Sequence, residues 1–250
     1  MLRKLKKALP AIVSAILCVT MALGITASAA SVWSETKALT TAKYNSNYIK
    51  WVEKYSAKDA KNTVTFGKSR TKKFYEKQLT AFNAKDPQFA VNMITKDEIL
   101  SVAYKGRKIK IVVYSEGEGI AMYMTQKNMT MLSVSDKEKV TMDMPSDVNY
   151  DELVDEMLDE YANWDNDSYY ADELGISDNA KGKLFKFKSG ENTYYYEEFE
   201  TDQGTAGFLF DSKGNPLAMN SDGTAVCFQI KYTVKDSEFT VPSGYKTVDY

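Results

Sequence analysis

Apolar and polar residues alternate along the chain from Phe89 to Met144, and short polar segments interrupt the alternation five times. A period of two residues is the pattern of a β-strand with one buried face, and the segments TKD, YKGR, EGEG, QKN and SDKE have the composition of turns. Pro87 and Pro145 flank this stretch, and proline is tolerated at the margins of a sheet. The pattern therefore predicts an antiparallel meander of six strands over residues 87–145.

The turns also predict which residues pair across the meander. We take each turn as a two-residue loop, the commonest hairpin connection. All five loops then place the apolar side chains on the same face of the sheet, and a shift of the strand pairing by one residue at any hairpin would break this agreement. The same register sets Met124, Met131 and Met142 side by side. The five loops are Lys96-Asp97, Lys105-Gly106, Gly117-Glu118, Lys127-Asn128 and Asp136-Lys137.

Six of the methionines on this apolar face lie as pairs on three successive strands. Methionine is unbranched and polarizable, and it suits surfaces that accept apolar groups of variable shape. Few helices remain to cover so long a face, so we predict that it lines a cavity for an apolar ligand. The alternative, an ordinary core packed against helices, stays open. Ile109 and Val140 belong to the same face, and the predicted cavity residues are Phe89, Val91, Met93, Leu100, Val102, Ile111, Val113, Met122, Met124, Met129, Met131, Met142 and Met144.

Helical spacing of apolar residues predicts further elements on both sides of the meander. Before it, we expect a helix around Tyr48–Tyr55 and another over residues 69–82, with Phe74, Tyr75, Leu79 and Phe82 on one face. After it, we expect a helix capped by Asn149 and a shorter one from Ser168 to Gly175. The apolar face of the helix after Asn149 comprises Leu153, Val154, Met157, Leu158 and Tyr161.

Alternation returns after Lys181 and predicts five more strands, separated by turns rich in Gly, Asp and Asn. The fold class is then mainly β with some α: a curled antiparallel half-barrel of about eleven strands, with helices as plug or lid. We expect a single domain over residues 30–250. It comprises a helical region (30–86), the meander (87–145), an acidic helical insert (146–180) and the C-terminal strands (181–250).

Residues 1–29 have the features of a secretory signal peptide, because a basic start is followed by an apolar stretch and small residues. The apolar stretch is short for a membrane span and contains Pro10. Cys18 follows large residues, which excludes lipid attachment there. We therefore expect a secreted monomer, outside the cell or in its envelope. Four of the 32 basic residues lie in this segment, so 28 remain against 34 acidic ones. Such an acidic chain is a poor nucleic-acid binder.

The chain contains no histidine, which excludes His-based triads and most zinc sites. Beyond the signal segment Cys227 is the sole cysteine, so no internal disulfide can form. We expect Val226, Phe228, Ile230 and Tyr232 to point inward, which leaves Cys227 on the other face as a structural thiol. We predict no catalytic residue, no cofactor and no metal.

Several motifs resemble catalytic or metal-binding signatures. Ser34-Glu35-Thr36-Lys37, Ser69-Arg70-Thr71-Lys72 and Ser177-Asp178-Asn179 are similar to serine acyl-enzyme motifs, but no K-T-G follows and such matches are expected by chance. Glu197 and Glu198 are adjacent on a strand and point to opposite faces, so they form no glycosidase pair; we expect them, with Glu200, on a solvated outer face. In residues 141–180, which hold 13 acidic and no basic residues, the segment NWDNDSYYADELG departs from the EF-hand pattern at Tyr169. We expect this acidic insert to oppose the Lys-rich region 37–85.

The order of elements, together with the C-terminal segments YYYEEFETDQGTAGFLFDSKGNPLAM and FQIKYTVKDSEFTVPSGYKTVD, resembles the lipoprotein-carrier (LolA/LolB-like) fold. The resemblance implies an incomplete barrel, closed by helices, that holds acyl chains. We therefore predict a secreted, non-enzymatic binder of an apolar or lipid-like molecule, a role compatible with transient contact with a membrane or an envelope protein. The alternative is a carbohydrate-binding or cell-wall-binding module that uses exposed aromatic rings such as Tyr194 and Tyr196.

Overall fold

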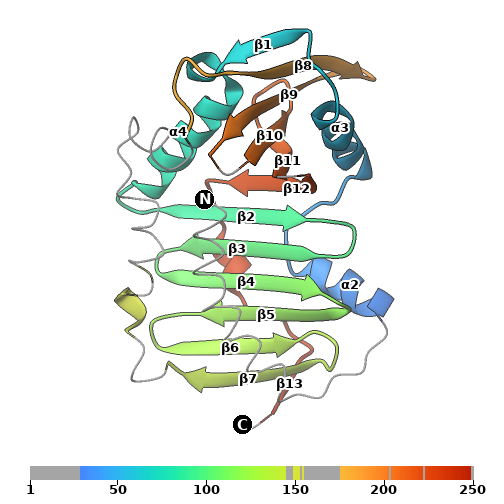
Figure 1. Ribbon diagram of the computed structural model, residues 1–250. Coiled ribbons are helices and arrows are strands. Elements are labelled where there is room, and N and C mark those ends of the chain that lie inside the picture. Colours follow the sequence, from blue (N-terminus) through green and yellow to red (C-terminus); the bar gives the residue numbers. More distant parts are fainter. Residues whose placement is uncertain are drawn as a thin grey trace.

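The main feature of the computed structural model is one continuous, open sheet of 13 strands among the described residues (Figure 1), which are 29–144, 149–152, 154, 175–202, 204–221 and 223–248. The strand order is β1-β8-β9-β10-β11-β12-β2-β3-β4-β5-β6-β7-β13. The strands are β1 (Asn62–Thr65), β2 (Gln88–Ile94), β3 (Ile99–Lys105), β4 (Lys108–Ser115), β5 (Glu118–Met124), β6 (Asn128–Ser133), β7 (Glu138–Asp143), β8 (Lys181–Ser189), β9 (Asn192–Thr201), β10 (Gly204–Phe210), β11 (Pro216–Ser221), β12 (Thr224–Lys231) and β13 (Lys246–Thr247).

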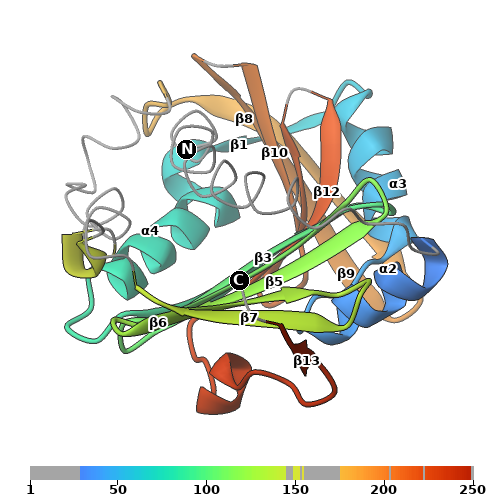
Figure 2. The same ribbon diagram turned by 90° about the horizontal axis from the view of Figure 1, so that it is seen from below.

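The sheet curls, so that β8, β10 and β12 stand at a steep angle to β3–β7 (Figure 2). The predicted fold class, a mainly β curled antiparallel half-barrel, is confirmed. The six strands of the meander and the five C-terminal strands meet where β12 pairs with β2. Two short strands were not expected: β1 pairs with β8, and β13 pairs in parallel with β7.

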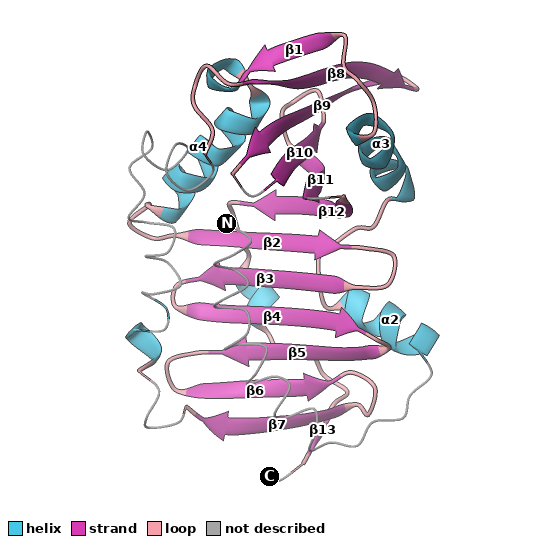
Figure 3. Cartoon of the chain, in the orientation of Figure 1, coloured by secondary structure: helices cyan, strands magenta, loops and turns pink. Residues whose placement is uncertain are grey.

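The helices lie on both faces of the sheet (Figure 3). Helix α4 (Arg70–Phe82) lies on the concave face, here called the inner face, whereas α2 (Ala29–Ala38) and α3 (Ser46–Ser56) cover the outer face. The predicted positions of α3 and α4 are confirmed, and Ser69 caps α4 with its side chain. None of the described helices has the length and hydrophobicity needed to span a bilayer. Residues 1–28 of the predicted signal segment and most of the acidic insert, including nearly all of the helix predicted from Ser168, lie outside the described residues.

The predicted sorting of faces in the meander is correct, but four of the five predicted pairings are wrong. Only the first hairpin pairs as predicted, Met93 with Leu100. In the other four the partners are shifted by two residues, so that Met122 pairs with Met131, and Met124 with Met129. A shift of two keeps every side chain on its predicted face. Met131 therefore pairs with Val140, and the predicted row of Met124, Met131 and Met142 does not form.

Turn geometry explains three of these four shifts. The second loop consists of Gly106 and Arg107, which both have positive φ (54° and 59°), as a type I′ hairpin turn requires. The third consists of Glu116 and Gly117, again with positive φ. The last connection is four residues long, between Ser133 and Glu138, rather than two.

The outer face of the meander is also buried, because α2 and the C-terminal segment pack on it. Val32 of α2 contacts a cluster that includes Ile94, Ile99 and Tyr114. Gly119 allows this approach, because a Cβ at that position would collide with the Thr36 hydroxyl of α2. The sheet is therefore a central layer with apolar contacts on both faces, and its inner face is the concave one.

Candidate functional site

The inner face carries the thirteen residues predicted to line a cavity, and they divide into a covered part and a more open part. Five of them are buried: Phe89, Ile111, Met122, Met124 and Met131. The other eight are half-buried: Val91, Met93, Leu100, Val102, Val113, Met129, Met142 and Met144.

The covered part is a closely packed cluster. Met122, Met124 and Met131 lie in one buried cluster with Tyr150 and with Phe82 of α4. The hydroxyl of Tyr150 donates to the carbonyl of Arg107 at 2.8 Å, and burial, helped by nearby Tyr104, raises the pKa of Tyr150 to about 12. These three methionines are therefore core, as in the alternative that the sequence left open.

The more open part is a contiguous apolar surface, which we call the inner patch: Val91, Met93, Leu100, Val102 and Val113. Its members are half-buried and are direct neighbours in the register, since Val91 pairs with Val102, Met93 with Leu100, and Leu100 with Val113. Ile230 of β12 extends it beyond Val91. The partly accessible surface on β2–β4 is thus mostly aliphatic, whereas the other half-buried members of the predicted set, Met129, Met142 and Met144, lie on or next to β6 and β7.

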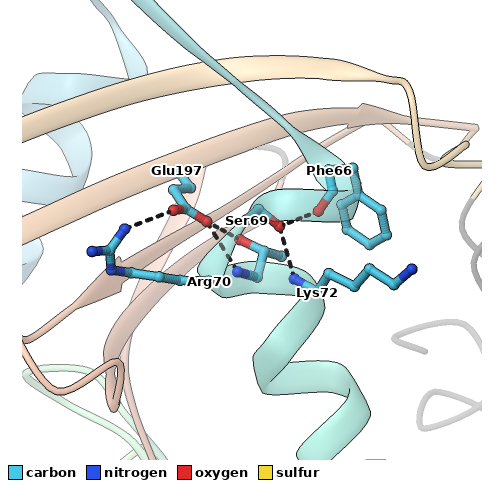
Figure 4. Close-up of polar contacts among 6 residues, drawn as sticks. Phe66, Ser69, Arg70, Lys72 and Glu197 are labelled. Atoms are coloured by element: carbon cyan, nitrogen blue, oxygen red, sulfur yellow. Dashed lines mark hydrogen bonds and ion pairs between the residues drawn. The ribbon is translucent and has the colours of Figure 1, made fainter.

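Helix α4 is fixed to the inner face by a buried carboxylate (Figure 4). Glu197 of β9 is fully buried, and its Oε2 accepts hydrogen bonds from the backbone N–H and the hydroxyl of Thr71, each at 3.0 Å. The guanidinium of Arg70 lies 3.4 Å from the other carboxylate oxygen and also stacks on the ring of Tyr195. A negative charge at a helix N-terminus is stabilised by the unpaired N–H groups there. Glu197 therefore anchors the start of α4.

Figure 4 also shows the structural role of the serine motif at residues 69–72. The Ser69 hydroxyl donates to the carbonyl of Phe66 at 2.7 Å and accepts from the N–H of Lys72 at 2.9 Å. It is a buried helix cap, and both of its hydrogen-bonding roles are occupied. The Lys72 ammonium pairs with Asp178 at 2.8 Å, which connects the Lys-rich region to the end of the acidic insert.

Glu198, which follows Glu197 on β9, holds a helix on the outer face in the same way that Glu197 holds α4 on the inner face. Glu198 is 4% exposed; it accepts from Ser56 at the end of α3 (2.7 Å) and from Tyr196, and it pairs with Lys183 (2.8 Å). Burial alone would raise the pKa of Glu198, but the hydrogen bonds from Lys183, Tyr196 and Ser56 outweigh it and lower that pKa. The prediction that Glu197 and Glu198 lie on a solvated face was therefore wrong, although they do point to opposite faces; Glu200 is exposed as expected.

The aromatic pair proposed as a sugar platform is not formed. Tyr196 is fully buried, and its hydroxyl donates to Glu198. Tyr194 is half-buried and packs against Trp51 and Phe187, with ring centroids 4.8 and 5.6 Å away. These rings cover one another between α3 and the edge of the sheet, so Tyr194 and Tyr196 do not offer two exposed, parallel ring faces on which a sugar could stack.

Cys227 lies on the outer face, as predicted. It is fully buried, and its Sγ accepts from the N–H of Asn45 at 3.3 Å. Burial raises the pKa of its thiol, which opposes formation of the reactive thiolate.

Two buried polar groups on the inner side were not among the predicted site residues, although Tyr232 was expected to point inward. Gln78 of α4 is 3% exposed, and the hydroxyl oxygen of Tyr232 is likewise buried. The signal for Gln78 was present in the sequence, because it lies four residues from both Phe74 and Phe82, at the centre of the helix face that the pattern assigns to the core.

Comparison with known proteins leaves the family open. No protein-family model matches the chain, and no characterised protein matches its sequence. Among solved structures, an uncharacterized conserved protein from Thermus thermophilus is similar over 71% of this chain and 98% of its own, with 10% identity and a TM-score of 0.31.

Proposed function

We propose that this protein binds an apolar or lipid-like molecule against the inner patch, as a secreted, non-enzymatic monomer with a lipoprotein-carrier-like fold. The observation that carries the proposal is the contiguity of half-buried apolar side chains on the concave face of β2–β4. Single exposed apolar residues are common on protein surfaces, but a contiguous apolar patch on a concave face is typical of a binding surface. An acyl chain laid along this patch would complete their burial.

Curvature supports the proposal further. A concave apolar surface contacts a ligand from several sides, which is how small-molecule sites bury most of their ligand. Helix α4 flanks this surface and is anchored at its N-terminus by Glu197, so its position over the sheet is defined. The carbohydrate alternative loses support because Tyr196 is buried.

The test uses N-phenyl-1-naphthylamine, an uncharged probe that fluoresces in apolar sites, with delipidated protein. Leu100→Trp adds bulk in the inner patch and is expected to weaken probe binding roughly tenfold, since pocket contacts of this size discriminate by about that factor. Leu217→Trp is the matched control, because Leu217 is also half-buried but packs in the outer cluster under α3. It should leave probe affinity unchanged.

Two results would contradict the proposal. One is the absence of probe binding by the unmodified protein. The other is equal probe affinity in Leu100→Trp and Leu217→Trp when circular dichroism shows that both are folded.

A further inference from the structure

Gln78 presents a complete amide group inside the apolar interior of the inner side. Its side chain is 3% exposed, and within the described part of the chain neither its Nε2 nor its Oε1 has a hydrogen-bond partner. Leaving both atoms of a buried amide unpaired is unfavourable, and such groups in native structures normally have an explanation. A leucine at this position would fill similar space without that cost.

The aromatic contacts of α4 locate this amide along the sheet. One turn before Gln78, Phe74 packs on Phe228 with ring centroids 5.8 Å apart, and one turn after it, Phe82 packs on Phe89 at 4.7 Å. Phe228 pairs with Met93, so these two contacts lie four residues apart along β2. That distance is about 13 Å, close to the rise of about 12 Å over the eight helical residues between Phe74 and Phe82. Gln78 therefore lies midway.

The residues midway along this path are the end of the inner patch. Val91 lies halfway between Phe89 and Met93 on β2, and Ile230 is its partner on β12. Both are half-buried, and both contact the two apolar clusters on either side. The amide of Gln78 is thus placed above the point where the inner patch passes under α4.

A second unpaired polar group lies on the same side of the sheet. Tyr232 follows β12 on the inner side, and the ammonium of Lys77 lies 4.8 Å from its ring centroid, which places the ring beside α4. Its hydroxyl oxygen is buried without a partner in the described residues, and burial raises the pKa of Tyr232. Gln78 and Tyr232, from different elements, therefore both carry buried polar atoms without a hydrogen-bond partner in the described residues, near one end of the inner patch.

We propose that Gln78, assisted by the Tyr232 hydroxyl, binds the polar head group of an amphiphile whose chain lies on the inner patch. This inference rests on the proposed function and specifies its ligand class. The carboxamide offers a donor and an acceptor together, and a tyrosine hydroxyl does the same. The matching head group is uncharged and both donates and accepts hydrogen bonds, as an alcohol or an amide does. A charged head group buried here would lose its hydration without enough hydrogen bonds or opposite charge to offset the loss.

The experiment measures displacement of N-phenyl-1-naphthylamine by two isomeric amphiphiles, 1-dodecanol and 1-methoxyundecane. The two have the same number of heavy atoms, but the ether cannot donate a hydrogen bond. The measured quantity is the ratio of the ether Kd to the alcohol Kd, compared between variants so that the different hydration of the two ligands cancels. We expect Gln78→Leu to lower this ratio about tenfold, since a site that hydrogen-bonds a hydroxyl strongly disfavours the analogue without the donor.

Two further variants complete the test. Tyr232→Phe keeps the ring beside Lys77 and removes only the hydroxyl, so it should lower the ratio by a smaller factor. Gln229→Leu is the matched control, because the Gln229 amide on the outer face donates to the carbonyl of Lys43 at 2.9 Å, and it should leave the ratio unchanged. In the absence of ligand, Gln78→Leu should also raise the thermal midpoint, because it removes the unpaired amide.

The outcomes separate this inference from the proposed function. If the unmodified protein binds the probe and both amphiphiles, but the ratio stays within twofold in both Gln78→Leu and Tyr232→Phe, the head-group assignment is wrong and the apolar site remains. If the unmodified protein binds neither the probe nor the amphiphiles, the proposed function itself fails.

Discussion

Removal of the Glu197 carboxylate is expected to be the most damaging single change to the position of α4. Glu197 is fully buried on β9 and accepts both hydrogen-bond donors of Thr71, a residue that is itself 1% exposed. Glu197→Ala would leave these donors without an acceptor in a site that water does not reach. It would also leave Arg70 without its carboxylate partner.

The size of the effect follows from these contacts. A hydrogen bond to a charged group contributes about 1.5–3 kcal/mol, and breaking a buried charged pair from one side costs about 3–5 kcal/mol. We therefore expect Glu197→Ala to lower the free energy of unfolding by about 3–5 kcal/mol. Glu197→Gln should cost about 1.5–3 kcal/mol, because its amide oxygen can still accept from Thr71. Arg70→Ala should cost only about 1 kcal/mol, because its side chain is 32% exposed.

Urea unfolding followed by circular dichroism measures these differences. Glu200→Ala is the control on the same strand: Glu200 is exposed, and its replacement should change the free energy of unfolding by less than about 0.5 kcal/mol. The reasoning would be refuted if Glu197→Ala cost no more than Arg70→Ala, since the buried acceptor would then contribute nothing beyond the half-exposed ion pair.

Three other predictions concern the core and the outer face. Met131→Trp should lower the free energy of unfolding by about 1–3 kcal/mol through overpacking of its buried cluster; a thermal midpoint equal to that of the parent would mean that space is available there. Glu198→Gln should be destabilising above about pH 4.5, and because the folded-state pKa of Glu198 is lowered, the difference from the parent should shrink as the pH falls through that pKa. A constant difference from about pH 7 to about pH 2 would contradict this. Cys227→Ser should fold and retain probe binding, at a cost of about 1–2 kcal/mol; in the parent, the thiol should react with Ellman's reagent only after unfolding, and rapid labelling of the native protein would argue against its burial.

Alternation alone was sufficient to assign the faces of the meander, for a geometric reason. Side chains alternate with a period of two, and moving a turn by one residue changes the pairing by two, which preserves the face. The apolar face was therefore predicted correctly even though four of the hairpins pair differently. The helix over residues 69–82 could likewise be predicted from the sequence, because its apolar spacing and its Ser69 cap are local features.

Which part of the inner face is covered could not be predicted, because that depends on contacts between distant segments. The pairing of Met131 with Val140 follows from a four-residue turn, and the burial of the methionine cluster requires Phe82 and Tyr150 to arrive from other elements. The unpaired state of Gln78 is equally a tertiary property, since it depends on what lies within reach of its amide.

The glutamates show the division between sequence and tertiary structure most clearly. Their adjacency on a strand already required that Glu197 and Glu198 point to opposite faces. Whether each carboxylate is buried or exposed to water depended on hydrogen-bond donors more than a hundred positions away in the sequence, Thr71 for Glu197 and Ser56 for Glu198. Burying a carboxylate is unfavourable unless such donors are in place, and only the tertiary structure brings them there.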